Sequence, residues 1–229
     1  IPYWDKKRRG ELWNLVSVCY RVLILKYLLS SLTCSTLQQL KGYFMEQAAL
    51  REGGKELSRA SETLLTDRRI RELREWVDEL LAQGIEHPKI EALLNIVRSN
   101  IGHRRIVFVG ARHSADAITK KINALDGHKA RIFIGKGKTQ AGVKGMSAKE
   151  QAQTIEAFKN GEFDTLVATQ IGEEGLDIPQ VDEVIFYEPV SDERRYIQRV
   201  GRQARDKPGE VYVLVATSTM DEPIYNICH

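Results

Sequence analysis

Three regularly spaced arginines are the residues of this chain best suited to contact a phosphate group. They lie in the segment QRVGRQARD, residues 198–206, as Arg199, Arg202 and Arg205. On a helix, positions i, i+3 and i+6 follow one side, where guanidinium groups form bidentate contacts with phosphate oxygens and stabilise charge during phosphoryl transfer. The alternative is a solvated basic face. Gly201 favours the first interpretation, because a glycine inside a helix costs about 1 kcal/mol relative to alanine and permits the close approach of a ligand.

A second segment, VATQIGEEGLDIP at residues 167–179, also carries groups that suit an anionic ligand. Thr169, Gly172 and Gly175 follow an apolar run, and glycines there allow positive φ and expose backbone N–H groups to an anion. Asp177 is placed to accept a hydrogen bond from a sugar hydroxyl. The adjacent carboxylates at 173 and 174 suggest a metal site at first sight, but no histidine or cysteine lies near them, which disfavours that interpretation.

The stretch RIFIGKGKTQ, residues 131–140, resembles a phosphate-binding loop but fails the test for one. The Walker pattern G-x-x-x-x-G-K-[ST] requires a glycine five positions before Gly137, where this chain has Ile132. A kinase that binds a nucleotide through residues 135–139 is therefore disfavoured. The alternative is a flexible basic loop in which Gly135 and Lys136 let a nucleic-acid phosphate approach closely.

The elements that must position these residues follow two different patterns. Up to about residue 81 the spacing of apolar residues is helical, and the first helix is apolar nearly all round, so we expect it to be buried between its own bundle and another surface. After residue 88, strands alternate with helices; the expected strands span residues 105–109, 130–134, 165–168, 184–187 and 210–215. Ser114 is expected to cap the helix after the first strand, and Ser147 with Glu150 forms a capping box. This alternation predicts an α/β fold with a mostly parallel sheet covered on both faces, whose ligands gather at the carboxyl ends of the strands.

Composition narrows the class of protein without identifying a partner. The chain has 229 residues, 42% of them hydrophobic, which suffices for one large domain or two modest ones. The net charge of +3 permits a polyanionic partner but does not require one. The three cysteines are far apart and suit neither a disulfide framework nor a zinc site, which predicts a reducing, intracellular setting. Residues 12–32 approach the length of a membrane span, but Arg21 and Lys26 within them favour a buried helix and no membrane contact.

The order and spacing of VATQIGEEGLDIP and QRVGRQAR resemble motifs V and VI of superfamily 2 helicases, and the phrase GEEGLDIP with VIFYEP is most similar to the archaeal Hef and FANCM branch that includes the RIG-I-like proteins. The segment VFVGAR, residues 107–112, looks like motif IV. The resemblance implies an all-helical insert, thumb-like, at residues 1–86, followed by the second RecA-like domain, with motifs IV, V and VI, at 87–229.

The resemblance also implies a role for each matching residue. Thr169, Arg112, Gly135 and Lys136 would contact a nucleic-acid strand, most of them through its backbone phosphates. Gly175, Asp177 and Gln198 would meet the nucleotide ATP, and Arg202 and Arg205 would be the arginine fingers. The close relatives resemble QRRGRTGR, whereas this chain has valine, glutamine and alanine at positions 200, 203 and 204. Both finger positions are retained, so the ATP contact is still expected.

What the sequence lacks bears on activity. It has neither a Walker loop nor a DExH motif, which hold the phosphates and Mg²⁺ on the first RecA-like domain of a helicase. We therefore expect the chain to be inactive alone and to work with that first domain, in cis or in trans, as the C-terminal half of an ATP-dependent helicase or translocase on forked or branched DNA. Its setting would be the cytoplasm, or the nucleus in a eukaryote. The alternative is a non-catalytic nucleic-acid-binding or adaptor protein derived from a helicase half.

Overall fold

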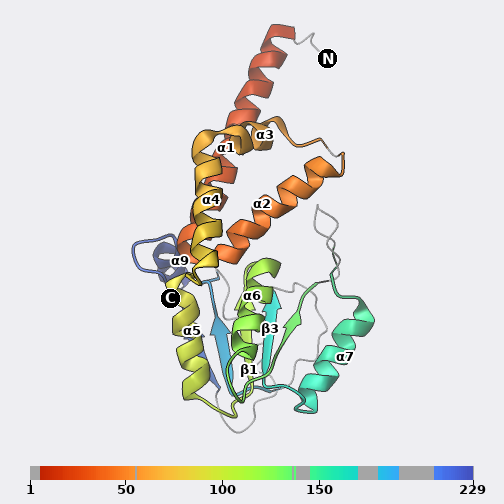
Figure 1. The fold of residues 1–229 in the computed structure, drawn as a ribbon, viewed down its shortest axis with the longest axis vertical. Coiled ribbons are helices and arrows are strands. Elements are labelled where there is room, and N and C mark those ends of the chain that lie inside the picture. Colours follow the sequence, from red (N-terminus) through yellow and green to blue (C-terminus); the bar gives the residue numbers. More distant parts are fainter. Residues whose placement is uncertain are drawn as a thin grey trace.

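A computed structural model describes residues 6–54, 56–135, 137, 145–169, 180–190 and 209–228 of the chain. A long helix and three shorter ones come first (Figure 1): α1 (Lys6–Cys34), α2 (Leu37–Glu52), α3 (Arg59–Thr66) and α4 (Arg68–Ala82). We call these four helices the helical unit. The strands that follow are β1 (Arg105–Val109), β2 (Ala130–Phe133), β3 (Thr165–Thr169), β4 (Glu183–Phe186) and β5 (Glu210–Val213). The helices among and after them are α5 (Pro88–Ser99), α6 (Arg112–Asn123), α7 (Ala148–Lys159) and α9 (Asp221–Cys228).

The strands form one parallel sheet in the order β2-β3-β1-β4-β5. This confirms the predicted α/β fold, and the ends of the strands differ from the predicted ones by at most two residues. The ends of the elements agree because local interactions set them. The capping box of Ser147 and Glu150 starts α7, and Gly161, with a φ of 73°, ends the turn that follows this helix.

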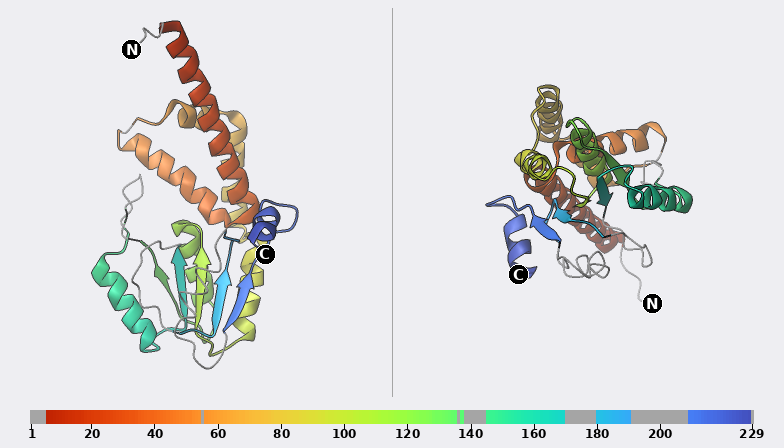
Figure 2. Two further views of the ribbon diagram at one scale, coloured as in Figure 1. Left: turned by 180° about the vertical axis from the view of Figure 1, so that it is seen from behind. Right: turned by 90° about the horizontal axis from the view of Figure 1, so that it is seen from below.

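Alternate residues of the central strands point to opposite faces and so build two separate cores. Val107 and Val109 of β1 pack with α5 and α6, which lie side by side on one face of the sheet (Figure 2). Ile106 and Phe108 pack with Phe158 of α7 on the other face. The central strands β1, β3 and β4 are therefore buried on both faces, and polar ligands must approach them from an edge of the sheet.

Helix α1 departs from the sequence-based prediction, because it is not buried. Its N-terminal end projects beyond the rest of the chain (Figure 1), and many of its large apolar side chains are exposed, Trp13 by 69% and Leu23 by 60%. By length and composition its segment Gly10–Cys34 is also able to cross a membrane. Only Leu28 and the last turns reach the core that α2 and α4 form with it. The apolar pattern of the helix was read correctly, but a sequence does not show which neighbours are present to cover it.

Helix α2 crosses α6 so closely that only a glycine fits at the contact. A Cβ atom added to Gly42 would lie 2.2 Å from two ring carbons of His113, and the same imidazole contacts Glu46 at 3.2 Å. Position 42 therefore sets how near the helical unit lies to the sheet.

We expect Gly42→Ala to lower the free energy of unfolding by about 1–3 kcal/mol, because the added methyl group must displace the imidazole of His113 at the contact of α2 with α6. Gly10→Ala in α1 is the matched control, since nothing lies within 4 Å of its Cβ position. There the substitution should stabilise the protein by about 0.5–1 kcal/mol through helix propensity. Urea unfolding of both variants checks this, and equal midpoints would contradict the close contact.

Candidate nucleic-acid interface

Three neighbouring strands of the sheet deliver the candidate contact residues to one edge. Gly110 and Arg112 follow β1, Gly135 follows β2, and Thr169 is the last residue of β3. In the register of the sheet Thr169 lies opposite Val109, directly before the loop that carries Arg112. The structure thus brings together Arg112, Gly135 and Thr169, three of the residues that sequence reasoning assigned to a nucleic-acid contact.

Arg112 holds the loop that follows β2. It is the first residue of α6, and its Nη2 atom donates to the carbonyl oxygens of Gly135 at 3.2 Å and Gly137 at 2.5 Å. The arrangement places a permanent positive charge at the carboxyl edge of the sheet and fixes the backbone of the neighbouring loop to it.

The helical unit docks on the same edge through a cluster of buried polar side chains. Ser35 and Thr36, which lie between α1 and α2, contact Ser114 of α6. The Oγ atom of Ser114 lies 3.2 Å from Oγ of Ser35 and 2.9 Å from Oγ1 of Thr36. Gln39 joins them, since its Oε1 accepts from Ser35 and Ser114. All four side chains are buried. A buried polar group without a partner is costly, so this cluster fixes one way of docking α2 against α6.

The role predicted for Ser114 was wrong. Helix α6 begins at Arg112, its N-cap is Ala111, and no side chain caps it. Ser114 lies inside the helix and is fully buried, with its hydroxyl turned toward α2. The local pattern of a serine before an apolar run suggested a cap, but a contact with residues almost eighty positions away determines its orientation.

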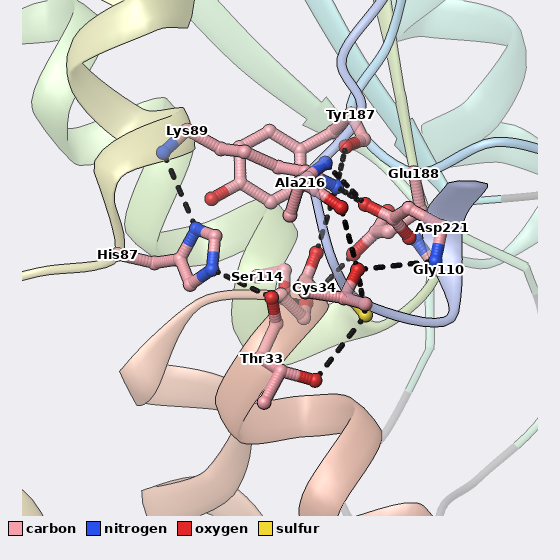
Figure 3. Close-up of polar contacts among 12 residues, drawn as sticks. Thr33, Cys34, His87, Lys89, Gly110, Ser114, Tyr187, Glu188, Ala216 and Asp221 are labelled. Carbon is pink, nitrogen blue, oxygen red and sulfur yellow. Dashed lines mark hydrogen bonds and ion pairs between the residues drawn. The ribbon is translucent and has the colours of Figure 1, made fainter.

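Sequence reasoning also missed a buried ammonium group beside this cluster (Figure 3). Lys89 donates to the backbone carbonyls of Cys34 and Tyr187, each at 3.0 Å, and to the carboxylate of Asp221. Both charged side chains are about 95% buried. One signal could have found it: Lys89 lies four residues before Leu93 and eight before Val97, on the stripe that α5 buries. A lysine on an apolar stripe must find partners for all three of its protons.

Burial shifts the proton affinities of the groups around this junction. It lowers the pKa of His87, whose ring nitrogen Nε2 lies 2.9 Å from the carbonyl of Thr33, and raises the pKa of Glu86. It also raises the pKa of Glu188, which follows β4. In each case the low polarity of the surroundings disfavours the charged form.

Several of the predicted site residues lie outside the part of the chain that the structure describes. They are Lys136, Gly175, Asp177, Gln198, Arg202 and Arg205. The assignments to ATP and to the arginine fingers therefore stay predictions. Among the described residues, no group of three histidine, cysteine or acidic side chains is placed to hold a metal ion.

The basic side chains of α4 divide into two groups. Arg68 pairs with Glu72 at 2.7 Å and Arg69 with Asp67 at 2.8 Å, as expected of a solvated helix face. Two others line a pocket of about 240 Å³ that is bordered by α2, α3 and α4, together with an arginine of α2 and apolar side chains of all three helices. The three pocket arginines are Arg51, Arg71 and Arg74. Arg68 and Arg69 therefore belong to a solvated helix face, whereas the other three arginines border one pocket together with the acidic Glu52.

Comparison with known proteins agrees with this geometry. Residues 88–207 match the model of the family described as helicase conserved C-terminal domain. The chain is 36% identical over 97% of its length to a Methanocaldococcus jannaschii protein named as an ATP-dependent RNA helicase, and 32% identical over 87% to the ATP-dependent DNA helicase mph1 of Neurospora crassa. It spans only 27% and 18% of the lengths of these relatives. The solved structure of the Hef helicase domain of Pyrococcus furiosus is similar in fold, with a TM-score of 0.67 and 33% sequence identity. The match covers 95% of this chain and 44% of the Hef chain.

Proposed function

The chain belongs to the helicase conserved C-terminal domain family, and on that premise we propose that it is the second RecA-like half of an ATP-dependent DNA helicase or translocase that acts on forked or branched DNA. In this proposal residues 1–86 form a helical insert and residues 87–229 the RecA-like domain. The relative mph1 of Neurospora crassa, which is named as an ATP-dependent DNA helicase, supports this choice of substrate. A role in DNA repair at replication forks, in the cytoplasm or in a nucleus, belongs to the same proposal.

The observation that carries the proposal is the meeting of three strand ends at one edge. Thr169, Arg112 and the Gly135 backbone lie at adjacent exits of β3, β1 and β2. A hydroxyl, a guanidinium group and an open backbone suit the oxygens of successive phosphates and read no base, so the grip would be independent of sequence. Lys136, the next residue after Gly135, would add a further positive charge.

The ATP-dependent part of the proposal rests on the family resemblance. Arg202 and Arg205 would stabilise the charge that develops on the γ-phosphate, while Gly175, Asp177 and Gln198 would contact the nucleotide. The Walker loop and the carboxylate that holds Mg²⁺ would come from the first RecA-like domain. Closure of the two domains around ATP would then shift the grip of this half on the DNA backbone.

A second candidate function is a nucleic-acid-binding adaptor without catalysis. The altered motif VI favours it, because valine, glutamine and alanine at positions 200, 203 and 204 replace residues of the related motif. The two candidates share the DNA contact and differ in ATP hydrolysis, so each needs its own test.

The DNA contact is tested by Arg112→Ala in an anisotropy titration of a fluorescent forked DNA between 50 and 200 mM salt. We expect the wild-type affinity to fall steeply with salt, and the variant to bind several-fold more weakly with a slope of log affinity against log salt that is smaller by about one. Arg98→Ala is the matched control, because it removes the same positive charge at the end of α5, where Arg98 forms an exposed ion pair with Glu91. Wild-type binding that does not weaken with salt would contradict the backbone contact.

A further inference from the structure

Glu188 contacts both the helical unit and the loop that carries Arg112. Its Oε2 atom accepts a hydrogen bond from the backbone N–H of Gly110 at 2.9 Å, and its Oε1 atom lies 2.6 Å from Oγ of Ser35. Gly110 is two residues before Arg112, and Ser35 lies between α1 and α2. Figure 3 shows the carboxyl group of Glu188 beside Gly110, next to the residues that bind Lys89. One side chain therefore joins two parts of the molecule that are distant in sequence.

A count of the available protons indicates which form of the carboxyl group is present. The Ser35 hydroxyl has one proton but two close oxygen acceptors, Glu188 Oε1 at 2.6 Å and Gln39 Oε1 at 2.7 Å. In the structure the amide oxygen of Gln39 faces Ser35 and Ser114, and its amide nitrogen donates to Ser31 Oγ at 3.1 Å. In this orientation of the Gln39 amide, an ionised Glu188 would leave one of the two short contacts as two oxygens without a proton between them.

A proton on Glu188 completes the network. Glu188 then donates to Ser35, and Ser35 donates to Gln39. On the other branch, Thr36 donates to Ser114, and Ser114 donates to the same amide oxygen at 2.9 Å. Every short contact then holds one proton, as buried polar networks require.

The surrounding charges permit the neutral form. Lys89 of α5 favours the ionised carboxylate, but its ammonium group is already bound to Asp221 and to two carbonyls, and Asp221 of α9 acts in the opposite direction. Ser35 and Ser114, which approach from the helical unit and from α6, carry no charge. Glu188 is half-buried as a residue, yet enclosure of its carboxyl group is the largest influence and raises its pKa.

We propose that Glu188 is a positioning residue that carries a proton and, through its hydrogen bonds to Ser35 and Gly110, ties the orientation of the helical unit to the Arg112 loop. The role for DNA rests on the proposed function, in which Arg112 faces the strand. A shift of the helical unit at Ser35 would move Glu188, and with it the backbone that places Arg112. The insert and the strand contact would then respond to one another through a single carboxyl group.

The sign of the pH dependence follows from the direction of the shift. The folded state holds a proton that the unfolded chain releases above the ordinary glutamate value of 4.5. The stability contributed by this proton is therefore complete below 4.5 and is lost as pH rises through the raised pKa of the folded state. Glutamine keeps the shape, the donor and the acceptor of the protonated acid and does not titrate, so Glu188→Gln should lack this loss.

The test compares wild type, Glu188→Gln and Ser35→Ala for affinity to forked DNA and for melting temperature between pH 4.5 and 9. At pH 4.5 we expect Glu188→Gln to bind within twofold of wild type and Ser35→Ala to bind at least about tenfold more weakly, because alanine removes the hydrogen bonds of the hydroxyl to Glu188 and Gln39. As pH rises, the DNA affinity of wild type should decrease relative to that of Glu188→Gln. Its melting temperature should decrease relative to that of Glu188→Gln over the same pH range. Ser99→Ala, which removes an exposed hydroxyl at the end of α5, is the matched control.

Two results would overturn the inference. If wild type and Glu188→Gln keep a constant ratio of affinities and a constant difference in melting temperature across this range, Glu188 does not carry a proton that matters. If Ser35→Ala binds DNA as wild type does, Glu188 does not couple the two parts. If wild type itself binds no DNA, the proposed function fails instead, and the difference in melting temperature between wild type and Glu188→Gln still decides whether the proton is there.

Discussion

Replacing Arg205 by alanine is expected to lower DNA-stimulated ATP hydrolysis by about a thousandfold when the chain acts with a first RecA-like half. An arginine that meets the γ-phosphate only as charge develops contributes to the transition state rather than to binding, and the loss of such a finger costs about 10³ or more in rate. The measurement is steady-state phosphate release at saturating ATP and DNA, with the two halves joined or mixed. Arg202→Ala should show a loss of the same kind.

The same variants separate the two candidate functions. Arg205→Ala should bind forked DNA within about twofold of wild type, because a finger on ATP makes no phosphate contact with the strand. Arg98→Ala, at the far end of α5, should hydrolyse ATP at the wild-type rate. If the assembled protein hydrolyses no ATP, or does so regardless of residue 205, the motor is excluded and the adaptor takes its place.

Replacing Arg105 by methionine is expected to lower the free energy of unfolding by about 3–5 kcal/mol, because it leaves a buried carboxylate without its main partner. Arg105 and Glu183 are both fully buried at the beginnings of β1 and β4, with Nε donating to Oε2 at 2.8 Å. Among the side chains that the structure describes, Glu183 would keep its contact with His103, at 2.8 Å, as its remaining partner. Urea unfolding followed by circular dichroism measures the change.

Two controls make this prediction specific. The exposed pair of Arg131 and Glu162, 3.2 Å apart, should contribute less than about 1 kcal/mol, so Arg131→Ala is the comparison for an ion pair in solvent. The double variant with methionine at positions 105 and 183 should recover much of the lost stability, since it removes both buried charges. If Arg105→Met is as stable as wild type, Arg105 and Glu183 do not form the buried ion pair that the structure shows. DNA affinity should not change, because the pair lies at the amino edge of the sheet.

The fold follows from local patterns that a sequence contains. The alternation of strands and helices, the capping box of Ser147 and Glu150, and the stop at Gly161 are interactions between neighbours, and the structure confirms all of them. The candidate interface was predictable for a related reason. Carboxyl ends of parallel strands meet at one edge, so residues after β1, β2 and β3 had to come together there, as Arg112, Gly135 and Thr169 do.

The errors have one physical origin, which is dependence on contacts that are distant in sequence. The serine at 114 looked like a cap until α2 supplied its partners, and α1 looked buried although little of the described chain covers it. The buried lysine of α5 finds its partners on three other segments of the chain. Patterns of neighbouring residues carry no information about these distant partners. The sequence alone therefore could not identify them.

By itself the sequence determined the class of fold, the edge of the sheet where ligands gather and the family of the chain, because periodicity, caps and short motifs are properties of neighbouring residues. Only the tertiary structure decided how the helical unit is joined to that edge. Glu188 became a candidate for coupling because folding places Ser35 and Gly110 on either side of one carboxyl group. The low polarity of that junction, which no single segment creates, raises the pKa of Glu188 and favours its proton.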